Sequence, residues 1–118
     1  MSILAYITDL AFQAQVSQAA HKADVEVQIV SSLYHFLPGV ERQASMVLID
    51  LNALGINSNM LIAQIKTKSP ELTVVVFASN LDEKSRKQAR KAGADTVLEG
   101  SKLSKDLPGI LTQYGEKK

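Results

Sequence analysis

Two aspartates, Asp9 and Asp50, stand at the ends of short apolar runs, where their carboxylates could do chemistry together. The runs cover residues 3–7 and 46–49. If both are strands of a parallel sheet, their carboxyl ends meet at one edge and the two carboxylates face each other. Such a pair can hold a divalent cation through oxygen ligands. Aspartate also follows strands because it favours turns, so a structural role is an equal alternative at this point.

The rest of the sequence excludes several other kinds of chemistry. The chain has no cysteine, which rules out disulfides, zinc–cysteine sites, iron–sulfur clusters and thiol catalysis. His21 and His35 lie on different predicted helices without a second ligand three or four positions away, so we expect them at the surface rather than on a metal. No glycine-rich phosphate loop and no nucleophile–base pair is recognisable. We therefore expect a protein that is not an enzyme and has no cofactor or resident metal.

The segments that must position the two aspartates alternate between strands and helices. Three of the strands are continuous apolar runs, which is typical of a parallel sheet covered on both faces. A strictly alternating segment and a short one suit the sheet edges, where one side is partly wet. The predicted strands are 3–7, 25–29, 46–49, 74–77 and 95–98.

Amphipathic stretches between these strands predict five helices. The first lies near 11–22, a short second one near 33–37, and a third around 61–65 that stops before Pro70. Asn80 is predicted to cap the fourth helix and Gly93 to end it. The fifth begins near 104. Met60, Leu61 and Ile62 are consecutive, so one of them must face solvent.

This order gives an α/β fold with a five-stranded, parallel, doubly wound sheet of the flavodoxin-like kind, in strand order 2-1-3-4-5. The 118 residues, 46% of them hydrophobic and 21% charged, fit a single domain, 1–118. No apolar run approaches the roughly 20 residues of a membrane helix, and the N-terminus is not a signal peptide. We therefore expect a cytoplasmic protein.

The chain resembles the receiver domain of bacterial response regulators over essentially its whole length. Residues 46–55 are similar to the third strand and following loop of that family, with Asp50 at the phosphoacceptor position. Residues 73–77, 82–91 and 92–95 resemble its fourth strand, fourth helix and Ala-Gly-Ala-Asp turn. The resemblance implies the same flavodoxin-like fold and a role in two-component signal transduction.

The acidic pair that receivers carry at the end of the first strand is incomplete. Counting along the predicted strands places Ile7 and Thr8 there, with Asp9 one position further on as the remaining member of an acidic pocket. Receivers use this pair to hold Mg²⁺ beside the phosphoacceptor. The resemblance therefore implies at most a weakened cation site.

Three further positions of the family's switch are also changed. Ala78 stands at the switch position of the fourth strand, where a hydroxyl residue is usual, although Ser79 follows it. Gly100 replaces the lysine that follows the fifth strand, and Lys102 comes two positions late. The aromatic residue of the fifth strand is Val97. A phosphorylated Asp50 would thus lack both its stabilising partners and its usual readout.

We therefore expect a pseudo-receiver that acts by protein–protein contact without phosphorylation. The alternative is a working receiver, phosphorylated on Asp50 by a histidine kinase with Mg²⁺ bound at Asp9 and Asp50. The net charge is +1, but residues 1–80 sum to −2 and residues 81–118 to +3. This charge is too small to favour nucleic acid. It favours an acidic protein partner or a second copy of the chain, at a surface that the resemblance places on Lys84, Arg86, Lys87, Arg90, Lys91 and Tyr114.

Overall fold

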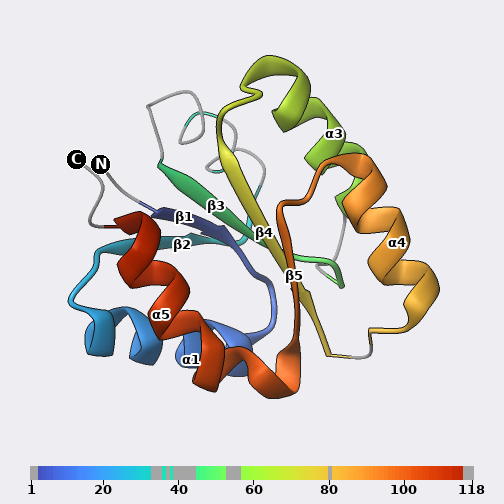
Figure 1. Ribbon diagram of the computed structural model, residues 1–118. Helices are drawn as coiled ribbons and strands as arrows, with labels where there is room; N and C mark the ends of the chain where they lie inside the picture. The colour runs from blue at the N-terminus through green and yellow to red at the C-terminus, as the bar shows by residue number, and fades with distance from the viewer. Residues whose placement is uncertain are drawn as a thin grey trace.

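Five parallel strands form one sheet in the order β2-β1-β3-β4-β5, with α1 and α5 on one face and α3 and α4 on the other (Figure 1). The computed structural model describes residues 3–32, 36, 38, 45–52, 57–79 and 81–115. The predicted fold class and strand order are confirmed. The predicted second helix, near 33–37, lies almost entirely outside the described residues.

The elements have the following bounds. The strands are β1 Ile3–Tyr6, β2 Val27–Val30, β3 Met46–Asp50, β4 Thr73–Ala78 and β5 Thr96–Glu99. The helices are α1 Leu10–Ala23, α3 Ser58–Lys68, α4 Glu83–Ala92 and α5 Leu103–Gly115, the last preceded by a 3₁₀ turn, Gly100–Lys102. No helix in the described ranges is long and apolar enough to cross a membrane.

Side chains of the central strands are buried on both faces, as the continuous apolar runs predict. Along β1, Leu4 and Tyr6 join the core under α3 and α4, whereas Ile3 and Ala5 join the core under α1 and α5. Strands β3 and β4 alternate in the same way. Leu61 and Ile62 of α3 are buried while Met60 is 60% exposed. The expectation that one of these three faces solvent is confirmed.

Two predicted boundaries were wrong for local reasons. The second strand starts at Val27 rather than Val25, because Asp24 takes a left-handed conformation and the Val25 N–H bonds to the Ala20 carbonyl, which keeps Val25 at the helix exit. The cap of α4 is Asp82, whose carboxylate accepts the Ser85 N–H at 2.7 Å. Asn80, the predicted cap, lies outside the described residues.

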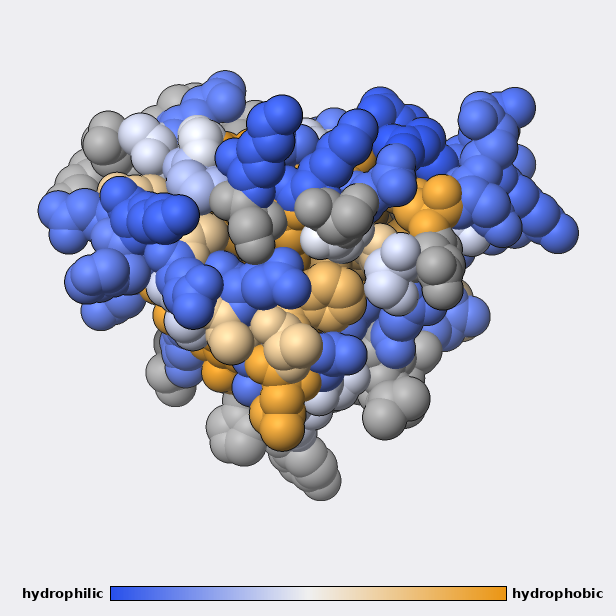
Figure 2. Space-filling view, turned by 90° about the horizontal axis from the view of Figure 1, so that it is seen from below, coloured by the Kyte–Doolittle hydropathy of each residue, from blue (hydrophilic) through white to orange (hydrophobic). Residues whose placement is uncertain are grey.

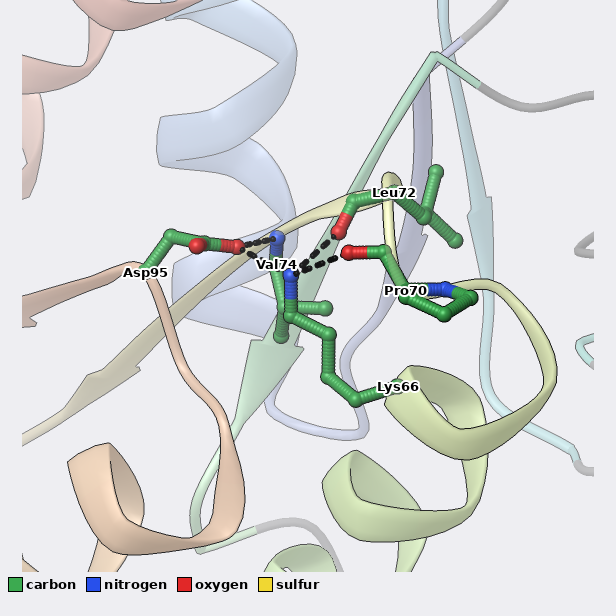
Figure 3. Close-up of polar contacts among 5 residues, drawn as sticks. All are labelled: Lys66, Pro70, Leu72, Val74 and Asp95. Atoms are coloured by element: carbon green, nitrogen blue, oxygen red, sulfur yellow. Dashed lines mark hydrogen bonds and ion pairs between the residues drawn. The ribbon is translucent and has the colours of Figure 1, made fainter.

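A polar network at the amino-terminal edge of the sheet joins α3, β4 and the turn before β5 (Figure 3). The Lys66 ammonium lies 2.9 Å from Asp95 Oδ2 and donates to the carbonyls of Leu72 at 2.8 Å and Pro70 at 3.3 Å. Asp95 Oδ2 also accepts the Val74 N–H at 2.8 Å. One carboxylate thus serves both a strand end and a lysine.

Gly93 is required beneath this network. Its φ of +123° is unfavourable for any other residue, and a Cβ there would lie 2.7 Å from Cγ of Lys66. The predicted end of the fourth helix at Gly93 is confirmed, and the lysine stem lies directly across it.

We expect Asp95→Ala to destabilise the fold by about 1–3 kcal/mol, because the part-buried Val74 N–H and Lys66 lose their common acceptor. Urea unfolding at neutral pH measures this. Glu71→Ala, which removes an exposed acid from the α3–β4 connection, is the matched control. Equal unfolding midpoints for the two variants would contradict the role given to Asp95.

Candidate functional site

Asp50 is the last residue of β3 and lies at the carboxyl edge of the sheet, where ligands bind in folds of this kind. It pairs with Phe77 of β4. Tyr6, the last residue of β1, pairs with Ile49 of β3. The residue after Tyr6, Ile7, therefore lies level with Asp50. Ile7 is fully buried and offers no oxygen ligand.

The Asp50 carboxyl is almost completely enclosed, with 1% of the residue exposed. Its Oδ1 accepts the Asn52 N–H at 2.9 Å. Burial raises the pKa of this carboxyl above its ordinary value; the hydrogen bond from Asn52 opposes the rise, and the negative charge of Asp9 adds to it. The Asp50 carboxyl is therefore shielded from solvent, and its charged form is disfavoured by that burial.

Asp9 serves α1 as its cap. It is exposed, and its Oδ1 accepts the Phe12 N–H at 3.1 Å, which stabilises the first turn of the helix. The structure therefore places Asp9 near Asp50 but gives its carboxylate a structural task. Across the described ranges, no group of three or more His, Cys, Asp or Glu side chains is placed to hold a metal ion.

The end of β3 is held by a serine that the sequence analysis missed. The Ser58 hydroxyl, buried at the start of α3, lies 3.2 Å from both the Asp50 and the Leu51 carbonyl oxygens and donates to them. A serine directly after the helix cap, Asn57, was the only signal in the sequence.

The aromatic ring of Phe12 occupies the space above Gly100. A Cβ on Gly100 would lie 2.8 Å from Cζ and 3.0 Å from Cε1 of Phe12, and 3.2 Å from Cα of Ser79. The ring also packs edge-on against Phe77, with centroids 4.9 Å apart at 69°. A side chain at position 100, lysine included, would have to displace this ring. In the sequence, Phe12 shares one face of the predicted helix with Val16, Ala19 and Ala20, which predicts burial but not this contact.

The view from below looks at the edge where the strands end (Figure 2). Apolar side chains reach the surface in the middle of this face, with hydrophilic ones around them. From the first turn of α1, Leu10 is 78% exposed and Phe12 is half-buried. Of the two residues at the end of β4, Ala78 is buried and Ser79 is exposed. Lys102 is exposed.

The basic residues lie on α4 as predicted by sequence, but they are not equivalent. Lys84, Lys87, Arg90 and Lys91 are exposed. Arg86 turns toward β5, where its guanidinium lies 3.8 Å from Glu99 and donates to the Val97 carbonyl at 3.4 Å. Tyr114 lies on α5, and its side chain is outside the described part of the chain.

A doubly wound parallel sheet with a polar site at its carboxyl edge defines an open α/β domain. Comparison with solved structures shows which α/β fold this is. The receiver domain of a DNA-binding response regulator from Colwellia psychrerythraea matches with a TM-score of 0.86 at 17% identity, over 96% of each chain. A BeF3-activated DrrB receiver domain matches with 0.84 at 20% identity, over 98% of this chain and 97% of that one.

A response regulator receiver domain protein from Methanospirillum hungatei matches with a TM-score of 0.82 at 18% identity, over 95% of this chain and 90% of that one. No family model and no curated protein matches the sequence. The chain therefore has the fold of response-regulator receiver domains.

Gly100→Ala should destabilise the protein by about 1–3 kcal/mol, because the added methyl overlaps the Phe12 ring and the Ser79 backbone. In a Phe12→Ala background the cost should shrink, which a double-mutant cycle in urea measures as coupling. Gly109→Ala is the control: a Cβ there meets nothing within 4 Å, and alanine should stabilise the helix by about 0.5–1 kcal/mol. Additive effects at positions 12 and 100 would contradict the contact.

Asp50→Asn should stabilise the protein at pH 7. The pKa of Asp50 is raised by folding, so the native state holds the proton more tightly, and stability falls as pH rises through the folded pKa. Asparagine avoids this loss and keeps an acceptor for the Asn52 N–H. Below about pH 4, where aspartate is protonated even when unfolded, the gain should vanish. Chemical unfolding between pH 3 and 8 measures it; a wild type more stable than the variant at pH 7 would refute the assignment.

Proposed function

We propose that the protein is a receiver-like signal-transduction module that acts by protein–protein contact and without a phosphorylation cycle. The contact of the Phe12 ring with Gly100 carries this proposal, because it fills the space from which a lysine would reach a phosphoryl group on Asp50. The module then has no catalytic activity of its own.

The electrostatics of the Asp50 edge support the same conclusion. A phosphoryl group on Asp50 would bring close to two negative charges into a site where the carboxyl is 1% exposed. Ile7 supplies no ligand for a cation, and Asp9 is engaged in capping. Loss of one electrostatic stabiliser typically costs about 100- to 1,000-fold in rate, and here both a lysine and an acid are missing.

The exposed cations of α4 are the surface that we propose for the partner. Lys84, Lys87 and Lys91 follow one another at spacings of three and four residues, so they form one stripe along the helix. An acidic protein surface complements this stripe and would bind more weakly as salt rises.

The second candidate function is a working phosphoacceptor. The position of Asp50 at the end of β3 favours it, and the DrrB receiver that shares the fold is BeF3-activated. In that case Mg²⁺ would bind between Asp9 and Asp50, and Lys102 would move toward the phosphoryl group.

Incubation with acetyl phosphate and Mg²⁺, followed by intact-mass analysis, separates the two functions. We expect no lasting addition of a phosphoryl group to the wild type, because the transition state finds neither lysine nor a complete cation site. A phosphorylatable receiver treated in parallel shows that the donor is active.

Asp50→Asn is the matched variant for this test. Stoichiometric modification of the wild type that disappears in Asp50→Asn would overturn the proposal. A second experiment tests the partner surface on α4, with an acidic peptide as the probe. Lys87→Glu should weaken binding of the peptide several-fold at low salt, whereas Lys22→Glu on α1 should not. Equal binding by both charge-reversal variants would remove α4 as the partner surface.

A further inference from the structure

A second feature of the carboxyl edge is a cavity of about 350 Å³ between the amino-terminal ends of α3 and α4. The polar residues that line it, among those the structure describes, are Asn52, Asn57, Ser58, Asn59, Ser85 and Gln88. We call this cavity the amide pocket. Its volume falls within the range of about 300–1,000 Å³ that small-molecule sites occupy.

The small side chain of Ala78 keeps the amide pocket open. Ala78 is the last residue of β4, is 2% exposed and lines the pocket with a single methyl group. The neighbouring walls are fixed: the Asn57 carboxamide caps α3 through the Met60 N–H at 3.1 Å, and the Ser58 hydroxyl donates to the Asp50 and Leu51 carbonyls. The pocket is therefore bounded by anchored groups.

Three carboxamides of the lining are left for a ligand. Within the described residues, the side chains of Asn52 and Gln88 make no hydrogen bond to protein, and Asn59 Oδ1 is buried without a partner. A buried acceptor of this kind destabilises the protein until a donor satisfies it. Each carboxamide both donates and accepts, which matches the pattern of a hydroxyl group.

The charges around the amide pocket define the ligand class. None of the described residues that line it is charged, so they supply neither the acids that hold a cation nor the bases that hold an anion. At the near end of α4 the Asp82 carboxylate already accepts the Ser85 N–H, and Glu83 adds a second negative charge in the first turn. These two acids offset the partial positive charge of the helix N-terminus and disfavour a phosphate or carboxylate. A polar lining also gives an apolar ligand little to gain. A neutral ligand rich in hydroxyl groups remains.

We infer that the amide pocket binds a small, neutral, polyhydroxylated molecule, a monosaccharide or a cyclic polyol, through the carboxamides of Asn52, Asn59 and Gln88. No part of this binding requires a phosphorylated Asp50. Ser85 and Gln88 belong to the helix that carries Lys87 and Lys91, so a bound ligand would brace that helix against α3.

Amide chemical-shift titration of the whole chain with D-glucose and with myo-inositol tests the inference. We expect saturable shifts, complete by about 10 mM for at least one of the two, centred on the backbone and side-chain amides of 52, 58, 59, 85 and 88. Inorganic phosphate at the same ionic strength should leave these signals unchanged.

Two variants make the result specific. Gln88→Ala, on the exposed side of α4, should weaken binding about fivefold to tenfold by removing a pair of hydrogen bonds. Gln18→Ala makes the same change on α1, across the sheet, and should have no effect. Failure of both sugars to saturate, shifts spread evenly over the surface, saturation by phosphate instead, or identical affinities for the two variants would each overturn the inference.

Discussion

Burial of β1, β3 and β4 on both faces determines where polar chemistry can lie in this protein. Every side chain of β1 and β3, and all but the first of β4, is buried, so polar groups are confined to the two edges of the sheet. One edge holds the shared carboxylate of Asp95 and the ammonium of Lys66. The other holds Asp50, the capping carboxylate of Asp9 and the amide pocket.

The two edges differ in how completely their charges are paired. At the Lys66 edge, one ammonium and one carboxylate satisfy backbone groups as well as each other. At the Asp50 edge, a buried carboxyl faces a second negative charge, and among the described residues it has no basic hydrogen-bond partner. The pairing of Lys66 and Asp95 stabilises the fold. The charge of Asp50 lowers the stability of the fold, and a neutral residue at this position would raise it.

The sheet was predictable from sequence because its signal is local. Continuous apolar runs identify central strands, and helices between them impose parallel pairing. The strand order then follows from the flavodoxin-like topology, in which the alternating and the short segment fall at the two edges. The predicted start of β2 was wrong because the conformation of a single residue determines it. Asp24 in a left-handed conformation delays β2, and nothing in its flanking residues separates it from an ordinary helix end.

The site was predictable in position but not in shape. The places of Asp50, Ala78 and Gly100 follow from counting along strands, whereas the Phe12 ring over Gly100 depends on how α1 is rotated against the sheet. The amide pocket requires two helix ends from separate segments to meet, with Ala78 small enough to leave room. Neither the spacing nor the composition of the sequence predicts the position of the Phe12 ring or the presence of the amide pocket.

The contact between Phe12 and Gly100 also has an evolutionary consequence. In a lineage that carries this pair, a single mutation that adds a side chain at position 100 collides with the Phe12 ring, while a single mutation that shrinks Phe12 opens a void beside Phe77. Both single steps pass through a less stable protein. The residues at positions 12 and 100 are therefore expected to change together in evolution, if they change at all.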